Sequence, residues 1–410
     1  MSNNNENKLV PRLRFPEFRD DGDWMEKEIS EVIEESRIPS NQSSPDKRIT
    51  VRLNLMGIEK REVRGTEAEG ATKFFIRKKG QFIYGKQNLH KGAFGIIPDE
   101  LDGFESSQDI PAFDFKEGFD SKYFVYYLSQ ESVHPELEKI STGTGSKRIH
   151  PRDFLKILFP FPKLTEQQKI AACLSSLDEV ITAEGKKLEA LKEHKKGLLQ
   201  NLFPQEGETV PKLRFPEFEN SGEWVEKTLG EIFVSYSGGT PSTNQNSYYG
   251  GNIPFIRSAE INKTSTELFL TEMGLKNSSA KMVSKGDLLI ALYGANSGDV
   301  AISKIDGAIN QAILCLKSDY SNLFVYHFLS SKKSWIVSKY IQGGQGNLSG
   351  EIVKSIKVLL PLKTEQQKIA ACLSSLDEFI TAQTQKIELL QQHKKGLLQG
   401  LFPTINEQNG

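Results

Sequence analysis

Two glycine-containing loops carry the residue types best suited to contact a nucleic acid. The first, "STGTGSKR", covers residues 141–148, and the second, "QGGQGNLSG", covers residues 342–350. Glycine lets a backbone approach a ligand closely, and the polar neighbours can bind phosphates or base edges. Neither loop fits the nucleotide-binding pattern GxxxxGK[ST], because Arg148 follows Lys147 and the second loop has no lysine. The loops therefore favour contact with DNA over nucleotide hydrolysis.

The segment before the first loop is locally basic. Between Lys47 and Lys91, 12 Lys and Arg residues face four acids, although the whole chain has a net charge of −1. A local basic face is what DNA binding requires, and the alternative is one solvated face of a strand-rich domain. The run 73–86 predicts a hairpin that turns at Lys79-Gly80. We predict DNA contacts in this half from Arg77, Lys78, Lys79, Lys86, Gln87, Asn88, His90, Lys91, Thr144, Ser146, Lys147 and Arg148.

Further polar loops follow apolar runs in the second half of the chain. The predicted DNA contacts there are Thr240, Arg257, Tyr293, Asn296, Gln342, Gln345 and Asn347. No GxGxxG motif opens a helix after a strand, and no NPPY-like motif of adenine methylation is present. The six histidines are scattered, and Cys173, Cys315 and Cys372 have no CxxC spacing. The sequence thus predicts no catalytic residues and no metal site in this chain.

Both halves of the chain share their beginnings and their ends. "PRLRFPEF" at 11–18 returns as "PKLRFPEF" at 211–218, and "TEQQKIAACLSSLDE" at 165–179 returns at 364–378. The offset stays at 199 or 200, whereas the stretches 33–140 and 233–340 show little similarity. An internal repeat of this kind indicates two copies of one structural unit with different middles.

The repeated ends predict two long helices. Thr165 with Gln168 fits a capping box at the start of the first, and proline ends each helix after "LF". The apolar residues fall at spacings of four and three, which is the pattern of a coiled coil. They are Ile170, Leu174, Leu177, Ile181, Leu188, Leu191, Leu198 and Leu202, with Ile369, Leu373, Leu376, Ile380, Ile387, Leu390, Leu397 and Leu401 in the second copy. We expect continuous helices over 165–203 and 364–402 that pack against each other in antiparallel orientation.

Polar residues interrupt the apolar seam at matched places. Glu184 and Gln383 lie at the midpoints of the two helices, and Lys195 and Lys394 occupy a second pair of slots. In an antiparallel pair the two midpoints meet, so Glu184 and Gln383 could fix the helix register. The alternative is a solvated gap in the seam beside Gly185. The repeat also predicts that Phe15 and Phe18 pack near Phe402, and that Phe215 and Phe218 pack near Phe203.

The predicted fold is α+β, with two strand-rich domains joined by two long antiparallel coiled-coil helices under pseudo-two-fold symmetry. The predicted boundaries are a disordered tail at 1–10, a first recognition domain at 11–162, a helix at 163–204, a second recognition domain at 205–361, a helix at 362–403 and a tail at 404–410. No apolar run is long enough to predict a membrane span. The three isolated cysteines and the absence of a secretion-signal pattern predict a cytoplasmic protein.

This order of segments resembles the specificity subunit (HsdS) of type I restriction–modification enzymes. The similar phrases are "PKLRFPEF", "GQGNLSGEIVKSIKVLLP", "PLKTEQQKIAACLSSLDE" and "HKKGLLQGLFP", and the resemblance covers residues from about 11 to 403. It implies that each variable domain reads one half of a bipartite, asymmetric site on double-stranded DNA. It also implies that the paired helices set the gap and dock two methyltransferase (M) subunits, and that motor-nuclease (R) subunits join the complex.

The resemblance further implies that this chain is non-catalytic and binds no cofactor. The M subunits would use S-adenosylmethionine, and the motor subunit would use ATP and Mg. Two alternatives remain open. One is a scaffold whose domains bind protein rather than DNA, and the other is a self-contained methyltransferase or endonuclease, which the missing catalytic motifs disfavour.

Overall fold

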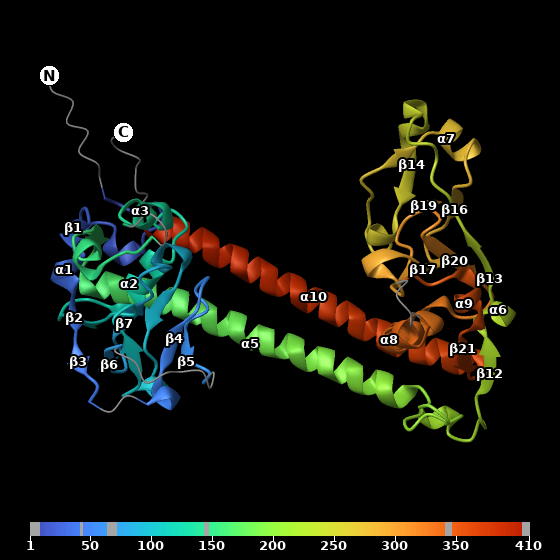
Figure 1. Ribbon diagram of the computed structural model, residues 1–410, viewed down its shortest axis with the longest axis horizontal. Helices are drawn as coiled ribbons and strands as arrows, with labels where there is room; N and C mark the ends of the chain where they lie inside the picture. The colour runs from blue at the N-terminus through green and yellow to red at the C-terminus, as the bar shows by residue number, and fades with distance from the viewer. Residues whose placement is uncertain (1–8, 42–43, 64–71, 143–146, 341–346, 404–410) are drawn as a thin grey trace. The chain divides into compact units, whose positions relative to one another are not determined.

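The chain folds into two compact units. The computed structural model describes residues 9–41, 44–63, 72–142, 147–340 and 347–403. Unit 1 comprises Met1–Gly185 and Lys386–Gly410, and unit 2 comprises Lys186–Gln385. Each unit therefore combines one variable domain with a part of both long helices (Figure 1). The boundaries expected from the sequence treat each helix as a separate segment, whereas the compact units divide both helices near their midpoints.

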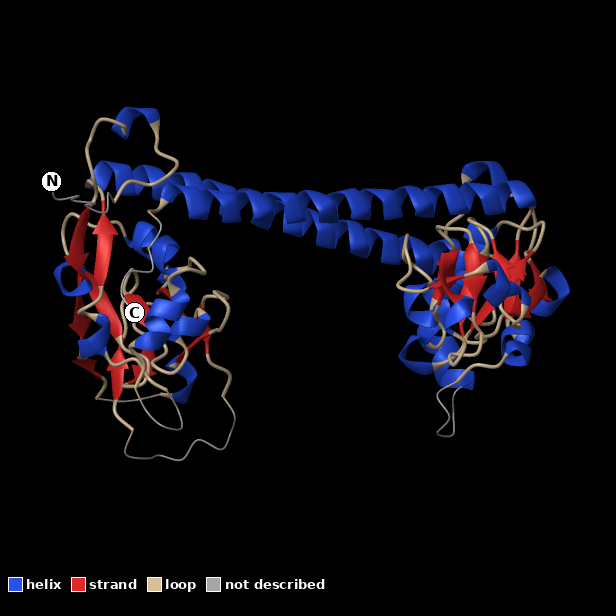
Figure 2. Ribbon diagram, turned by 90° about the horizontal axis from the view of Figure 1, so that it is seen from above, coloured by secondary structure: helices blue, strands red, loops and turns tan. Residues whose placement is uncertain are grey.

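Unit 1 is built from short strands and short helices, and its strands lie on one side of the long helices (Figure 2). Its strands are β1 (Met25–Glu28), β2 (Ile33–Ser36), β3 (Ile38–Pro39), β4 (Ile49–Val51), β5 (Ile58–Lys60), β6 (Phe74–Ile76), β7 (Phe82–Tyr84), β8 (Phe94–Ile96), β9 (Glu105–Ser107), β10 (Ala112–Phe115) and β11 (Leu158–Phe161). Its short helices are α1 (Ile29–Val32), α2 (Ser121–Leu128), α3 (His134–Lys139) and α4 (Pro151–Phe154).

Unit 2 has the same kind of composition. Its strands are β12 (Val225–Thr228), β13 (Val234–Ser237), β14 (Tyr249–Ile256), β15 (Phe269–Leu270), β16 (Lys281–Val283), β17 (Leu288–Ala291), β18 (Val300–Ile302), β19 (Gly307–Ile309), β20 (Ile313–Lys317) and β21 (Lys357–Leu360). Its helices besides the long ones are α6 (Leu229–Ile232), α7 (Glu272–Lys276), α8 (Asn322–Tyr340) and α9 (Gly350–Ser355).

The central sheets of the two units have one topology despite their dissimilar sequences. Unit 1 has the strand order β2-β10-β7-β8, and unit 2 has the order β13-β20-β17-β18. Both sheets are antiparallel throughout. In each unit a further two-stranded pair, β1-β11 or β12-β21, joins the start of the domain to the strand that precedes a long helix. The repeat found at the domain ends therefore extends through the middles, where the sequence does not show it.

The expected hairpin at 73–86 is only partly confirmed. The chain turns at Lys79-Gly80, and Gly80 has the positive φ of 79° that such a turn favours. However, β6 pairs with β3 and β9, whereas β7 pairs with β10 and β8. The two strands thus belong to different sheets. All three residues of β7 are fully buried, so this strand lies inside the central sheet between β10 and β8.

The two long helices are α5 (Leu164–Leu202) and α10 (Lys363–Leu401), of 39 residues each. Each begins one residue earlier than expected, so Thr165 lies inside the first turn and does not form the predicted capping box. The side chain of Gln167 instead ties this start to the preceding segment, because it donates to the carbonyl of Pro162 at 2.9 Å. Gln366 does the same to Pro361 at 3.0 Å.

Within each unit the long helices lie antiparallel. In unit 1, Lys394 contacts Asp178 at 2.6 Å and Lys386 contacts Glu184. Residue numbers therefore rise along α5 in the direction in which they fall along α10. In unit 2, Lys195 contacts Asp377 at 2.5 Å, and Leu202 shares a core with Ile369 and Leu373. Both lysines that interrupt the apolar seam are thus neutralised by an aspartate of the facing helix, a pairing that the heptad pattern does not reveal.

The end of each long helix closes the core of a domain. Phe402 packs edge-on against Trp24 with ring centroids 6.4 Å apart, and Phe15 is packed against the same cluster. In unit 2, Phe203 and Trp224 are 6.3 Å apart, and Phe215 is packed there. The predicted packing of Phe15 and Phe215 is confirmed. Phe18 and Phe218 instead remain half-buried in short 3-10 helices, Pro16–Phe18 and Pro216–Phe218.

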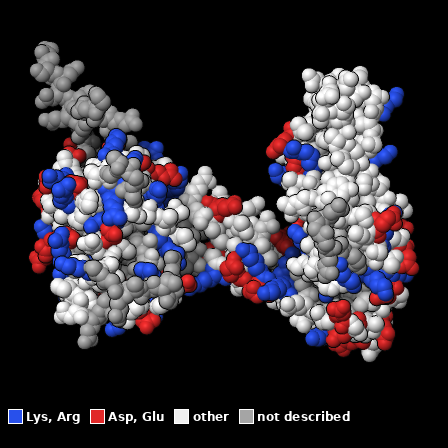
Figure 3. All heavy atoms as spheres, viewed as in Figure 1, with Lys and Arg blue, Asp and Glu red and all other residues white. Residues whose placement is uncertain are grey.

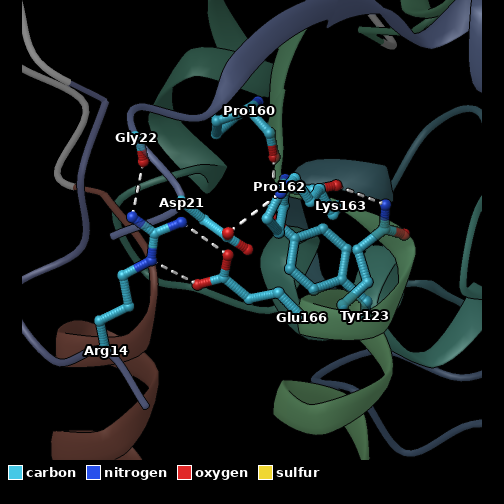
Figure 4. A network of polar contacts seen from close by, with 9 residues as sticks. Arg14, Asp21, Gly22, Tyr123, Pro160, Pro162, Lys163 and Glu166 are labelled. Carbon is cyan, nitrogen blue, oxygen red and sulfur yellow. Dashed lines mark hydrogen bonds and ion pairs between the residues drawn. The ribbon is translucent and has the colours of Figure 1, made fainter. Parts of the chain in front are cut away.

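A buried ion pair attaches the start of each domain to the start of a long helix. The guanidinium of Arg14 donates through two nitrogens to both carboxylate oxygens of Glu166, each at 2.8 Å, and through the third to the carbonyl of Gly22 at 2.6 Å (Figure 4). The side chains are 7% and 1% exposed. Glu166 raises the pKa of Arg14 by this hydrogen bond. Arg214 and Glu365 repeat the arrangement in unit 2 at 2.7 Å.

A second polar contact joins one helix of each variable domain to a long helix. In unit 1 the hydroxyl of Tyr126, on α2, donates to Asp178 at 2.7 Å. His327, on α8, occupies the equivalent place in unit 2, where its Nε2 is 3.1 Å from the hydroxyl of Ser374 and its Nδ1 is 3.9 Å from Asp377. Burial lowers the pKa of His327 to about 4, against an opposing effect of Asp377. The imidazole is therefore neutral at pH 7.

This buried histidine predicts an acid-sensitive fold. The unfolded chain binds a proton to His327 near pH 6.5, whereas the folded chain does so only near pH 4. Stability should therefore fall as the pH drops from about 6.5 toward 4, by up to about 3 kcal/mol. In chemical unfolding followed across that range, His327→Gln should remove this part of the drop. His194→Gln, an exposed position on α5, should leave it unchanged, and an equal drop in both variants would contradict the assignment.

Among the described residues, no helix is long and apolar enough to cross a membrane.

Candidate nucleic-acid interface

One edge of the central sheet in unit 1 gathers most of the predicted contacts of that domain. Ala112 is opposite both Ser36 and Ile83, and Tyr84 is opposite Phe94. Strands β2 and β7 therefore end, and β10 and β8 begin, at the same edge. The loop after β7 holds Lys86, Gln87, Asn88 and Lys91 there. We call this edge, with its loops, the unit 1 loop edge.

The exit of the first glycine loop reaches the same edge. The backbone N–H of Ile149 donates to the carbonyl of Lys86 at 2.9 Å, and Arg148 forms an ion pair with Asp109 at 3.0 Å. Lys147 is exposed and pairs with Glu138 at 3.1 Å. The structure thus brings the basic loop after β7 and the end of the glycine loop together.

The polar side chains of the unit 1 loop edge differ in their exposure to solvent. Gln87 and Lys91 are exposed, whereas Asn88 and His90 are half-buried. Lys86 is also half-buried, and burial lowers its pKa. Burial likewise lowers the pKa of His90. The exposed pair is therefore best placed to reach a phosphate or a base edge.

Arg77 is a correction to the sequence-based prediction. Its side chain is only 1% exposed, and it donates to the hydroxyl of Ser106 and to the carbonyls of Ser36 and Ile110 at 2.7–3.0 Å. Burial lowers its pKa to about 10. Arg77 therefore links β2, β9 and the segment before β10 inside the domain.

Lys78 and Lys79 are exposed but lie at the wrong end of β7. They precede the strand, and the N–H of Gly80 donates to the carbonyl of Ile97, beyond the far end of β8. The length of β7 separates them from Lys86. Lys78 and Lys79 therefore do not share an edge with Lys86, because a strand that crosses the core carries its two flanking loops to opposite edges.

The second unit has an equivalent edge. Ser237 is opposite Leu314, Ile313 is opposite Ala291, and Ile290 is opposite Val300. The loops after β13 and β17 and before β20 and β18 thus meet, and they carry Thr240, Tyr293 and Asn296. We call this the unit 2 loop edge.

Two further predicted residues reach the unit 2 loop edge. The side chain of Asn347 accepts from the N–H of Gly294 at 3.3 Å, and the N–H of Leu348 donates to Leu292. Arg257 follows β14, whose end lies beside the end of the parallel strand β19. Its guanidinium is bound by Glu260 and Glu267, which raise its pKa. Tyr293 remains 40% exposed.

Sequence reasoning missed two residues of this edge. Gln311 accepts a hydrogen bond from the hydroxyl of Thr240 at 2.8 Å, and the carbonyl of Asn310 accepts one from Gly238 at 3.2 Å. Both lie in the short connection "NQA" between β19 and β20. Their only sequence signal is a pair of amides between two apolar runs, which is too weak to separate them from an ordinary turn.

Some predictions are not tested by the described residues. Thr144, Ser146, Gln342 and Gln345 lie outside them. Glu184 contacts Lys386 within unit 1, and Gln383, in unit 2, is 6% exposed. The role of this pair in helix register stays a prediction.

The units differ in surface charge. The visible face of unit 1 carries many Lys and Arg side chains among scattered acids, whereas the visible part of unit 2 around β14 and α7 is almost uncharged (Figure 3). In the described parts of the chain, no group of three or more His, Cys, Asp or Glu residues is placed to hold a metal ion.

Comparison with known proteins identifies the family of this chain. A family model described as "Type I restriction modification DNA specificity domain" matches the chain twice, at residues 21–193 and 221–392. The chain belongs to this family. Each copy of the specificity domain begins close to the repeated N-terminal phrase and ends within a long helix, so the copies follow the repeat.

Two curated relatives and a solved structure are similar over large parts of the chain. The "type I restriction enzyme MjaX specificity subunit" of Methanocaldococcus jannaschii is 28% identical over 285 residues, which are 67% of this chain and 65% of the relative. The EcoR124I/EcoR124II specificity subunit of Escherichia coli is 30% identical over 188 residues, 42% of this chain and 46% of the relative. These alignments thus span less than two thirds of either relative.

The solved structure is the S subunit of a type I restriction-modification system from M. genitalium. It aligns with a TM-score of 0.65 over 97% of this chain and 100% of that chain, at 17% sequence identity. This similarity establishes the fold, two strand-rich domains with two long helices. The expected α+β architecture is confirmed.

Proposed function

We propose that this chain is the DNA-specificity subunit of a type I restriction–modification system, in which each loop edge reads one half of a bipartite, asymmetric site on double-stranded DNA. One observation carries the proposal. The two units share a sheet topology, yet their loop edges carry unrelated side chains. A shared sheet topology with two different sets of loop side chains suits the recognition of two different DNA sequences.

The long helices give the proposal its spacing element. A helix of 39 residues is about 58 Å long, and one turn of B-DNA is about 34 Å. Two domains attached to such helices could therefore read sites separated by unread base pairs. We propose that the helices set this gap and dock two methyltransferase (M) subunits, with motor-nuclease (R) subunits joining the complex.

The chemistry would belong to the partners. We propose that this chain is non-catalytic and binds no cofactor, that the M subunits supply S-adenosylmethionine chemistry, and that the motor subunit uses ATP and Mg. The names of the curated relatives, which are specificity subunits, support this division of roles. The cytoplasm, where the genomic DNA of a bacterial or archaeal cell lies, is the proposed location.

Mapping of DNA methylation tests the proposal most directly. The chain is expressed with its methyltransferase subunits, and the genome is sequenced with a method that detects methylated bases. A single motif with two unlike halves and a fixed gap is expected. Methylation that does not depend on the chain, or a palindromic motif, would contradict the proposal.

Lys91 should contribute a phosphate contact at the unit 1 loop edge. Lys91→Gln in the methyltransferase complex is expected to weaken binding several-fold on specific and unrelated duplexes alike. The slope of log K against log salt should fall in magnitude by about 1, as expected for one lost phosphate contact. Fluorescence anisotropy at several salt concentrations measures both quantities.

Lys79→Gln is the matched control for this prediction. Lys79 is an exposed lysine of the same domain at the opposite end of β7. Its substitution should leave the affinity and the salt slope unchanged. Equal losses in both variants, or a loss only in Lys79→Gln, would show that the loop edge is not the binding surface.

A further inference from the structure

The turn between β4 and β5 has an unusual backbone. Asn54 and Leu55 have φ values of 56° and 60° and are the two non-glycine residues with positive φ among the described residues. Leucine is strongly disfavoured in this left-handed region, because its Cβ crowds the following carbonyl. Such outliers persist only where the surroundings hold them, and they gather at functional sites.

The neighbouring loop of the unit 1 loop edge holds this turn. The N–H of Asn54 donates to the carbonyl of Lys91 at 2.9 Å, and the N–H of Leu55 donates to that of Gly92 at 3.0 Å. Gly92 is itself required here, since its φ is 72° and a Cβ at this position would lie 3.0 Å from the Leu55 nitrogen. The turn is thus fixed directly to the residue expected to contact a phosphate.

The tip of the turn is apolar and exposed. Met56 is 77% exposed, Leu55 43% and Leu53 42%. Single exposed apolar residues are normal on a protein surface, but here three of them fall within four positions on a strained tip. Two exposed cations flank the tip, namely Arg52, which also pairs with Glu59, and Lys91. Residues 53–56 are called the apolar tip.

We propose that the apolar tip is a wedge that enters the stacked bases of the first half-site and unstacks one base step, with Met56 as its leading side chain. The inference rests on the proposed function. Apolar side chains inserted at a base step are an established way for proteins to kink a duplex, and cations beside them neutralise the adjoining phosphates. The fixed turn presents the wedge without a further loss of backbone entropy on binding.

A protein partner is the competing occupant of this region. Leu55 and Gly57 line a cavity of about 680 Å³ together with residues of α2, α5 and α10 such as Val125 and Leu398. Met56, the most exposed residue of the tip, is not part of that lining. The absence of Met56 from the cavity lining, and the backbone bonds that tie Asn54 and Leu55 to Lys91 and Gly92, favour DNA.

The test uses the complete methyltransferase complex and a duplex that carries the mapped site. The fluorescent base 2-aminopurine, which brightens when it is unstacked, is placed at each step of the first half-site in turn. The wild-type complex should brighten one position several-fold. Met56→Gln should abolish most of that increase and weaken binding about tenfold, which is about 1.4 kcal/mol. A mismatch at the same step, which removes the need to unstack, should restore most of the lost affinity.

Met25→Gln is the matched control, because Met25 is 63% exposed in β1 of the same unit. It should behave as wild type in every measurement. If Met56→Gln binds the site with unchanged affinity and unchanged fluorescence, the wedge is refuted while the proposed function stands. If Met56→Gln instead retains less methyltransferase subunit on purification, the tip is a protein contact and the wedge is again refuted. If the wild-type complex shows no preference for the mapped site, the proposed function itself fails.

Discussion

Glu365→Ala should lower the free energy of unfolding by about 3–5 kcal/mol. Glu365 is fully buried and binds two nitrogens of Arg214 at 2.7 Å. Removal of the carboxylate would leave the arginine charge buried with a single remaining acceptor, the carbonyl of Gly222. Urea-induced unfolding at pH 7, followed by circular dichroism, measures the loss.

A surface ion pair between neighbouring segments gives the control. Lys368 contacts Glu217 at 3.2 Å, and both side chains are about half exposed. Lys368→Ala should lower stability by less than about 1 kcal/mol. The double variant Arg214→Met with Glu365→Leu should recover much of the loss, because no charge is then left buried. A loss of under 1 kcal/mol in Glu365→Ala would show that the ion pair does not hold the domain to the helix.

Lengthening both long helices by one heptad should widen the recognised gap by about three base pairs. Seven helical residues add about 10.5 Å, and each base pair of B-DNA spans about 3.4 Å. Inserted after Gly185 and after Thr384, the residues keep the heptad phase of both seams. Methylation mapping should find the two original half-sites at the new spacing, with modification of the original site reduced more than a hundredfold.

Insertion into one helix alone provides the contrast. It offsets the two helices by one heptad, so the pairs Asp178–Lys394 and Asp377–Lys195 can no longer form at the same time. Little methylation of either spacing is expected from that variant. An unchanged gap in the double insertion would show that the helices do not set the spacing.

The long helices could be predicted from the sequence because their signals are local or repeated. The heptad spacing identifies the apolar seam, the proline after "LF" ends each helix, and the second copy confirms both boundaries to within one residue. The paired packing of Phe15 and Phe215 also follows from the repeat. Arg14 and Glu166 could have been found in the same way, since each lies in a repeated phrase and a buried pair requires both members.

The loop edges could be predicted only in part. Lys86, Gln87, Asn88 and Lys91 do share an edge with Arg148, as their chemistry suggested. However, Lys78 and Lys79, which are equally basic and only a few residues away, lie at the other end of β7. Burial is equally hidden in the sequence, because the guanidinium of Arg77 finds its three acceptors on segments 29 to 41 residues away.

The sequence by itself determined the repeat, the two helices, their apolar seams and the family. Tertiary structure alone decided which polar loops share a sheet edge, which arginine is buried, and where Asn54 and Leu55 are held against Lys91. The physical reason is the separation in sequence of the residues that interact. Helix periodicity depends on residues three or four apart and a repeat can be read directly by comparing two stretches, whereas a sheet edge is set by the register of strands that come from distant parts of the chain.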